Sequence, residues 1–243
     1  MSYFLINLLG MGMLYLIPVP LHEGDGMYLN AVIQNKVKTC FNVIAESVKM
    51  AKRHLNFYGH LQIQNVHIHI LNEHTPEFER AVWIQDIKNH NHDWILMSDA
   101  GCPAIADPGT ELVMEAHRYG LQVKTLGVPS AITMAVMLSG LSGQRFWFEG
   151  YLPAETLKRP SRIKFLERQS EKEHNAVFCI ETPYRNASLV KDFLLHLKPQ
   201  TRLFIGYHLG SPSELIKTQS ISDWKRSNFA FKEKAPCVFG FKA

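Results

Sequence analysis

Residues 94–109 read Trp94-Ile-Leu-Met97 followed by Ser98-Asp-Ala-Gly-Cys-Pro-Ala-Ile-Ala-Asp-Pro-Gly109. Four consecutive apolar residues are typical of a strand buried on both faces of a parallel sheet. The next twelve residues hold two glycines, two prolines and two aspartates, and none is bulky. Because open α/β sheets bind ligands at the carboxyl ends of their strands, this loop is a candidate binding site. A tight turn with capping aspartates explains the same composition equally well.

Outward from this loop, apolar runs alternate with helical spacing through the first half of the chain. The expected strands are Met13–Pro18, Phe41–Ala45, Val66–Leu71, Trp94–Met97 and Val123–Leu126. The expected helices are Met27–Lys36, Val48–Tyr58, Pro76–Asn89 and Thr110–Tyr119. Such alternation predicts an N-terminal, mostly parallel five-stranded sheet.

The second half shows a different order of elements. Its expected strands are Phe146–Glu149, Ala176–Glu181, Leu203–Tyr207 and Cys237–Phe241, with a further strand within Ser211–Ser222. Its expected helices are Ala131–Leu141, Ser161–Glu173 and Ala187–Leu197. The sequence therefore predicts two unlike α/β domains, residues 1–127 and 128–243, the second with a mixed sheet and a cleft between the two. Residues 1–12 are interpreted as an extension.

The composition of the chain indicates the cellular compartment that we expect for the protein and the kinds of site that we do not expect in it. The chain has 243 residues, a net charge of +4 and four scattered cysteines without a C-x-x-C pair. Dispersed cysteines are typical of reduced thiols, so we expect a cytoplasmic protein without a zinc or redox site. The apolar N-terminal run has no preceding Lys or Arg and meets prolines early, so we expect neither a signal peptide nor a membrane span. The histidine pairs His67/His69 and His90/His92 lack i, i+4 spacing, which disfavours a metal site.

Positive charge gathers in two groups. The first comprises Lys158, Arg159, Arg162, Lys164, Arg168 and Lys172, and the second comprises Lys36, Lys38, Lys49, Lys52 and Arg53. Each group is interpreted either as a solvated surface or as a surface that contacts phosphates.

A second small-residue loop, Gly127 to Ala131, follows the next predicted strand. Two such loops, at the ends of neighbouring strands, can form two walls of a pocket that binds a nucleoside. The chain lacks the G-x-G-x-x-G dinucleotide fingerprint after its first strand and also lacks a P-loop, so neither of those classes is indicated.

Six segments in a fixed order then resemble the tetrapyrrole methylase superfamily, and within it the ribosomal RNA small-subunit methyltransferase I branch. They are Leu14-Tyr-Leu-Ile-Pro-Val-Pro20, Ala45-Glu46, Ser98 to Gly109, Pro129-Ser-Ala131, Phe148-Glu-Gly-Tyr-Leu-Pro153 and Glu181-Thr-Pro-Tyr-Arg185. The resemblance covers about residues 13 to 243.

This resemblance implies an S-adenosyl-L-methionine-dependent methyltransferase that is usually a homodimer. It implies 2′-O-methylation of a cytidine ribose in ribosomal RNA, so the expected partner is that RNA or the small ribosomal subunit. The implied donor-binding residues are Pro18, Asp99, Ala100, Gly101, Cys102, Ile105, Ser130, Ala131, Glu181, Thr182 and Leu209.

The chain departs from the branch mainly where the acceptor would bind. Ser47 and Lys49 stand where the branch has Asp and Arg, and Cys102 replaces a threonine of the donor loop. A ribose hydroxyl needs a base, for which Glu46 is the first candidate, and its alternative role is that of a carboxylate at a helix N-terminus. Glu149 and Arg185 are expected to orient the acceptor, and Arg185 alternatively pairs with Glu181.

Two other functions remain open on the sequence alone. The protein could methylate a small molecule such as a porphyrinoid, or it could bind the donor or RNA without catalysis. The basic group from Lys158 to Lys172 favours RNA over a porphyrinoid.

Overall fold

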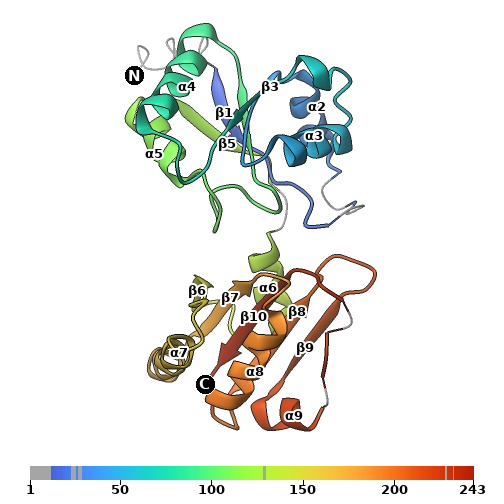
Figure 1. Ribbon diagram of the computed structural model, residues 1–243, viewed down its shortest axis with the longest axis vertical. Helices are drawn as coiled ribbons and strands as arrows, with labels where there is room; N and C mark the ends of the chain where they lie inside the picture. The colour runs from blue at the N-terminus through green and yellow to red at the C-terminus, as the bar shows by residue number, and fades with distance from the viewer. Residues whose placement is uncertain (1–11, 23–25, 27–28, 128–129, 228, 232) are drawn as a thin grey trace. The chain divides into compact units, whose positions relative to one another are not determined.

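The computed structural model describes residues 12–22, 26, 29–127, 130–227, 229–231 and 233–243. The chain divides into two compact units, Met1–Val128 and Pro129–Ala243. Each unit has its own sheet and its own core (Figure 1).

The first unit is built on a five-stranded parallel sheet. Its strands are β1 (Met13–Leu16), β2 (Asn42–Ala45), β3 (His67–Ile70), β4 (Trp94–Met97) and β5 (Gln122–Thr125). Their order is β3-β2-β4-β1-β5, with β4 and β1 in the middle. Every pairing is parallel, so the predicted fold of this half is confirmed.

Helices cover both faces of this sheet (Figure 1). One face carries α2 (Ala31–Thr39) and α3 (Val48–Phe57), and the other carries α4 (Glu77–His90) and α5 (Thr110–Arg118). A 3₁₀ turn, η2 (Ile63–Asn65), precedes β3. Burial on both faces explains why Trp94–Met97 is apolar throughout.

The first helix begins later than its sequence pattern predicts. The side chain of Asn30 accepts a hydrogen bond from the backbone N–H of Val32 at 2.8 Å and caps α2. Residues 27 and 28 lie outside the described part of the chain, but Leu29 is not helical. The predicted helix was therefore wrong at Leu29 and Asn30, because the side-chain cap of Asn30 starts the helix at Ala31.

The second unit contains a mixed sheet. Its strands are β6 (Phe146–Tyr151), β7 (Ala176–Glu181), β8 (Arg202–Tyr207), β9 (Leu215–Ser220) and β10 (Cys237–Lys242), in the order β6-β7-β10-β8-β9. Only β6 and β7 pair in parallel, and the other neighbours are antiparallel. The predicted class, two unlike α/β units with a parallel and a mixed sheet, is confirmed.

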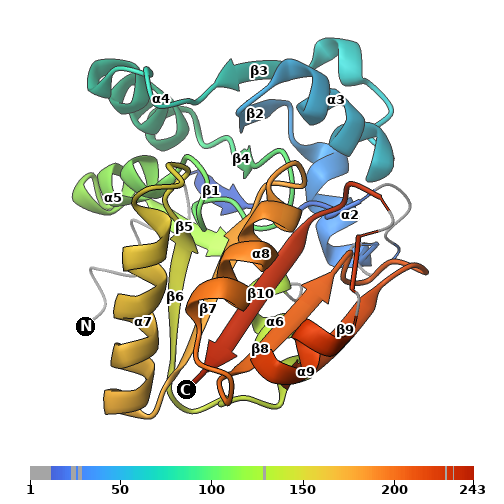
Figure 2. The ribbon, with the colours of Figure 1, turned by 60° about the horizontal axis from the view of Figure 1, so that its bottom comes forward.

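The two faces of the mixed sheet are covered unequally (Figure 2). Helix α6 (Ala131–Ser139) packs on one face, where Ala135 belongs to the same buried cluster as Phe178 and Phe204. The other face carries α7 (Arg159–Glu173), α8 (Asn186–His196) and α9 (Ile221–Arg226).

Helix α9 was not predicted. Within Ser211–Ser222 the strand ends at Ser220, whose side chain caps α9 by accepting from Asp223 N at 3.1 Å. The indole of Trp224 then donates to Leu203 O at 2.8 Å and fixes the short helix on the sheet. Among the described residues, no helix is long and apolar enough to cross a membrane.

Candidate functional site

The loop after β4 is tied to the segment after β1. Val19 N donates to Gly101 O at 2.8 Å, and Gly101 N donates to Val19 O at 3.1 Å. Gly101 has a φ of 79°, and a Cβ there would stand 3.3 Å from Leu21 Cδ2. Glycine is therefore favoured where these two segments of the chain approach each other at the carboxyl edge of the sheet.

Asp99 is held by three groups, Glu46 and Ser47 from the turn between β2 and α3, and His54 from α3. Its backbone N–H donates to Glu46 Oε1 at 3.1 Å, and its carboxylate accepts from Ser47 Oγ at 3.2 Å. The buried His54 donates from Nε2 to Asp99 O at 3.0 Å. Ser47 also caps α3 by accepting from Met50 N at 3.2 Å. The loop is thus fixed on the side of α3 before any ligand arrives.

Three carboxylates lie close enough to influence one another at this edge. Burial, with the nearby charges of Glu46 and Asp99, raises the pKa of Asp107 to about 7. Burial also raises the pKa of Glu46, and the Asp99 charge adds to that shift. A partly buried negative region of this kind favours a cationic ligand, and its groups can exchange a proton near neutral pH.

The other predicted donor residues of this unit differ in their surroundings. Pro18 is buried, and its carbonyl oxygen accepts from Tyr58 Oη at 2.6 Å. Burial and the neighbouring Asp107 raise the pKa of the Cys102 thiol. Ala100 and Ile105 are exposed. The structure therefore brings Glu46, Ala45 and the residues after β4 together, while the side chain of Ile105 stands at the surface.

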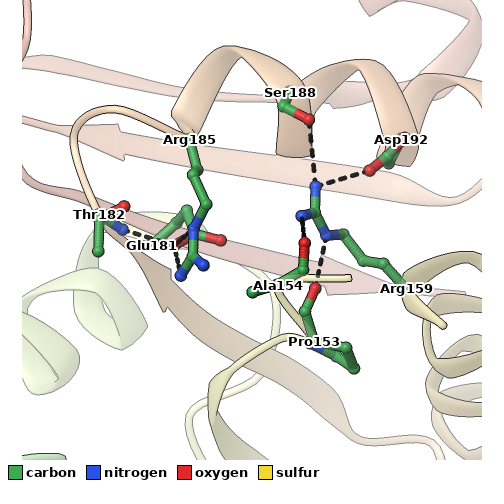
Figure 3. A network of polar contacts seen from close by, with 8 residues as sticks. All are labelled: Pro153, Ala154, Arg159, Glu181, Thr182, Arg185, Ser188 and Asp192. Carbon is green, nitrogen blue, oxygen red and sulfur yellow. Dashed lines mark hydrogen bonds and ion pairs between the residues drawn. The ribbon is translucent and has the colours of Figure 1, made fainter. Parts of the chain in front are cut away.

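In the second unit, Glu181, Thr182 and Arg185 form one cluster (Figure 3). Glu181 Oε1 accepts from Thr182 N at 2.7 Å and from Arg185 Nε and Nη2 at 2.8 and 2.6 Å. Glu181 Oε2 is buried and has no hydrogen-bond partner in the described structure. The ion pair was the alternative role considered for Arg185, and the unpaired oxygen leaves Glu181 with capacity to accept one more donor.

The remaining predicted residues of this unit lie around α6 and β6. Ser130 caps α6 in a reciprocal arrangement with Thr133, and Ala131 and Leu209 pack in the apolar cluster beneath that helix. Glu149 Oε1 accepts from Arg162 Nε and Nη2, both at 2.6 Å. The carboxylate of Glu149 is therefore paired with Arg162 of α7.

One cation of the first basic group has a structural role. Arg159 is 1% exposed and donates to the carbonyl oxygens of Pro153 and Ala154, both at 2.8 Å (Figure 3). It also contacts Ser188 Oγ at 3.2 Å and Asp192 Oδ2 at 2.8 Å. Arg159 cannot contact phosphates from this position, so that part of the phosphate-surface interpretation was wrong.

Sequence reasoning missed two residues that fix Asp99, Ser47 at the cap of α3 and His54 within the helix. Ser47 was noted only as a departure from the family pattern, although a serine directly before a helix is a signal for a cap. His54 carries no such signal, because its role depends on tertiary contact. Among the described residues, no group of three or more His, Cys, Asp or Glu side chains could hold a metal ion.

Relatives of known name match both units of this chain. "Ribosomal RNA small subunit methyltransferase I" of Buchnera aphidicola is 26% identical over 230 residues, 93% of this chain and 75% of the relative. The protein of the same name from Halalkalibacterium halodurans is 31% identical over 207 residues, 85% of this chain and 65% of the relative. The chain is a relative of ribosomal RNA small subunit methyltransferase I. The predicted resemblance is thus confirmed, and no family model matches the chain.

Solved structures with a similar fold support the architecture of this chain. A diphthine synthase has a TM-score of 0.60 at 13% identity, covering 95% of this chain and 89% of its own. A uroporphyrin-III-C-methyltransferase from Thermus thermophilus has a TM-score of 0.53 at 15% identity, covering 95% and 92%. At such low identity these likenesses concern the fold alone.

Proposed function

We propose that this chain is an S-adenosyl-L-methionine-dependent methyltransferase that acts on small-subunit ribosomal RNA, at a ribose 2′-hydroxyl. The observation that carries the proposal is the match to methyltransferase I relatives, which extends over 93% of the chain and includes both units. The loop after β4, which is held by hydrogen bonds to Val19 and Glu46, supplies a site of suitable chemistry.

The residues around this loop fit the donor. S-adenosylmethionine carries a sulfonium cation and supplies an already activated methyl group, so the protein mainly has to bind and orient the reactants. The carboxylates of Glu46, Asp99 and Asp107 give the loop a negative field, and the exposed, small Ala100 leaves part of its surface open to a ligand. No metal is needed for such a transfer.

The proposed donor contacts in the first unit are Pro18, Asp99, Ala100, Gly101, Cys102 and Ile105. Those in the second unit, Ser130, Ala131, Glu181, Thr182 and Leu209, rest on the family resemblance. The unpaired Oε2 of Glu181 adds a physical reason for one of them, because a buried carboxylate oxygen needs a hydrogen-bond donor.

Glu46 is the proposed base for the ribose hydroxyl. Its raised pKa brings its proton affinity closer to that of a useful general base, and its contact with Asp99 N places it beside the donor loop. Glu149 and Arg185 are proposed to orient the acceptor, each while paired with a neighbour, Arg162 and Glu181 respectively.

The family resemblance also supports a cytoplasmic homodimer that binds ribosomal RNA or the small subunit. The transfer experiment below tests the RNA partner, and sedimentation equilibrium of the purified chain tests the homodimer.

The test is transfer of tritium from methyl-labelled S-adenosylmethionine. Small ribosomal subunits and a porphyrinogen are offered separately, and labelled RNA is hydrolysed with alkali, which leaves a 2′-O-methylated linkage intact. The proposal expects label in the RNA at an alkali-resistant linkage. Label only in the porphyrinogen favours the small-molecule alternative, and donor binding without transfer to either favours a non-catalytic role.

A further inference from the structure

A cavity of about 240 Å³ lies directly beside the donor loop, within the first unit. One wall comes from α3, through Met50, Arg53, His54 and Phe57. These positions follow one helical face, since they are spaced three, four and seven residues from the first. Leu21 and Asp99 are among the residues that line the opposite walls, from the segment after β1 and the loop after β4.

The wall from α3 combines flat apolar surface with positive charge. Phe57 and Met50 are partly buried, and Arg53 is exposed at the same wall. Lys49 and Lys52 are also exposed on α3 and extend the positive charge along the helix surface. Lys36, from the same basic group in the sequence, instead pairs with Asp93 at 2.6 Å. An aromatic side chain next to cations is the usual composition of a site for single-stranded nucleic acid.

The size of the cavity selects among ligands. Pockets for small molecules usually measure about 300–1,000 Å³, so this cavity is too small for a porphyrinoid ring. A single unstacked base has the flat shape and the limited size that the cavity requires.

Charge also sets the direction in which a nucleotide would lie. Asp99 lines the cavity on the loop side, where its carboxylate repels phosphate, whereas Arg53 lines it on the α3 side. A phosphate therefore belongs near Arg53 and Lys52, and the ribose hydroxyls belong near Asp99. His54 and Ser47 hold this wall in place through their bonds to Asp99.

We propose that this cavity holds one unstacked base of the RNA acceptor, with α3 binding the flanking phosphates and Phe57 stacking on the base. The inference rests on the proposed function, since it names where that function's substrate is bound. It assigns a role in substrate recognition to α3, which provides none of the proposed catalytic groups.

The test measures RNA binding by fluorescence anisotropy, with the full chain and a labelled transcript of small-subunit ribosomal RNA as the probe. Arg53→Ala and Lys52→Ala each remove one cation, and Phe57→Leu removes the ring but keeps apolar volume. Arg118→Ala and Phe78→Leu are the matched controls, because both residues are exposed on helices of the other sheet face. Thermal melting of each variant verifies that it is folded, and calorimetry measures its affinity for S-adenosylmethionine.

We expect each cation variant to reduce the slope of log K against log salt by about 0.7, the value for one phosphate contact on a single strand. Phe57→Leu weakens RNA binding by about tenfold and leaves that slope unchanged. The affinity for S-adenosylmethionine and both control variants stay at the wild-type level.

RNA binding at the wild-type level in all three α3 variants would overturn the inference, whatever the activity. A loss of S-adenosylmethionine affinity in Phe57→Leu would also overturn it, because the cavity would then belong to the donor. Failure of the wild-type chain to bind the donor or transfer a methyl group tells against the proposed function instead, and RNA binding by the variants still tests the cavity.

Discussion

Glu46 shows how one side chain serves structure and, in our proposal, chemistry. Its Oε1 accepts from Asp99 N at 3.1 Å, which is the structural use, and burial raises its pKa, which suits the chemical one. Substitution by glutamine separates the two, because the amide oxygen of glutamine still accepts the backbone bond but the side chain no longer takes a proton.

We therefore expect Glu46→Gln to bind S-adenosylmethionine as the wild type does and to transfer methyl groups roughly 10²–10⁴-fold more slowly. Wild-type transfer should rise with pH through a pKa above 4.5, as the Glu46 carboxyl loses its proton. Single-turnover rates across pH measure both effects. Unchanged turnover in the glutamine variant would remove Glu46 from the role of base.

Asp107 gives a prediction about stability. Its pKa is raised from 3.8 to about 7 by burial and by Glu46 and Asp99. Between these values the folded chain keeps a proton that the unfolded chain has lost, so raising the pH removes stability until the pH passes about 7.

Asp107→Asn resembles the protonated form at every pH. Its stability relative to the wild type should accordingly increase from pH 4 to pH 7 and stay constant above, in line with the raised pKa of Asp107. Urea denaturation of both proteins at several pH values measures this difference. A difference that is independent of pH would mean that Asp107 ionises normally in the folded protein.

Ser47 marks the limit of reading single residues from the sequence. Its replacement of the family's aspartate suggested a change on the acceptor side, yet the hydroxyl caps α3 and binds the Asp99 carboxylate. A residue pattern can show the cap, but the bond to Asp99 spans 52 residues and exists only in the folded chain.

Among the elements, α7, α8 and the loop after β6 are joined by one buried guanidinium. Arg159 holds Pro153 and Ala154 through their carbonyl oxygens and reaches Asp192 on α8 (Figure 3). Removal of the cation leaves these acceptors, including a charge that is mostly buried, without their donor.

We expect Arg159→Met to lower the free energy of unfolding by about 3–5 kcal/mol, the usual cost of breaking a buried pair. Arg168→Met, on the exposed face of the same helix, should change it by less than about 0.5 kcal/mol. Urea denaturation of the two variants provides the comparison. Equal losses in both would show that the Arg159 network contributes little.

Long apolar segments were predictable as elements because burial on both faces forces their composition, as in Trp94–Met97. The boundaries of helices and strands were less predictable, because they depend on single side chains, such as that of Asn30, which caps α2. Helix α9 has only six residues, too short for a periodic pattern, and its stability depends on the contact of Trp224 with β8.

At the level of the whole molecule, the family motifs predicted more than the physical patterns alone. Alternating strands and helices indicated α/β units with a parallel and a mixed sheet, and both sheets are present. Small residues indicated a ligand loop, but the cluster of Glu46, Asp99 and Asp107 required the folded sheet, because its members come from two strand ends and a loop.

The central claim is that this chain binds S-adenosylmethionine at the loop after β4. Isothermal titration of the full chain with S-adenosylmethionine and with S-adenosylhomocysteine, compared with Gly101→Val, tests it most directly. The account predicts saturable binding at one site per chain, and loss of that binding in the variant, whose side chain would meet Leu21. Absence of any uptake of either compound by the folded wild-type chain would contradict it.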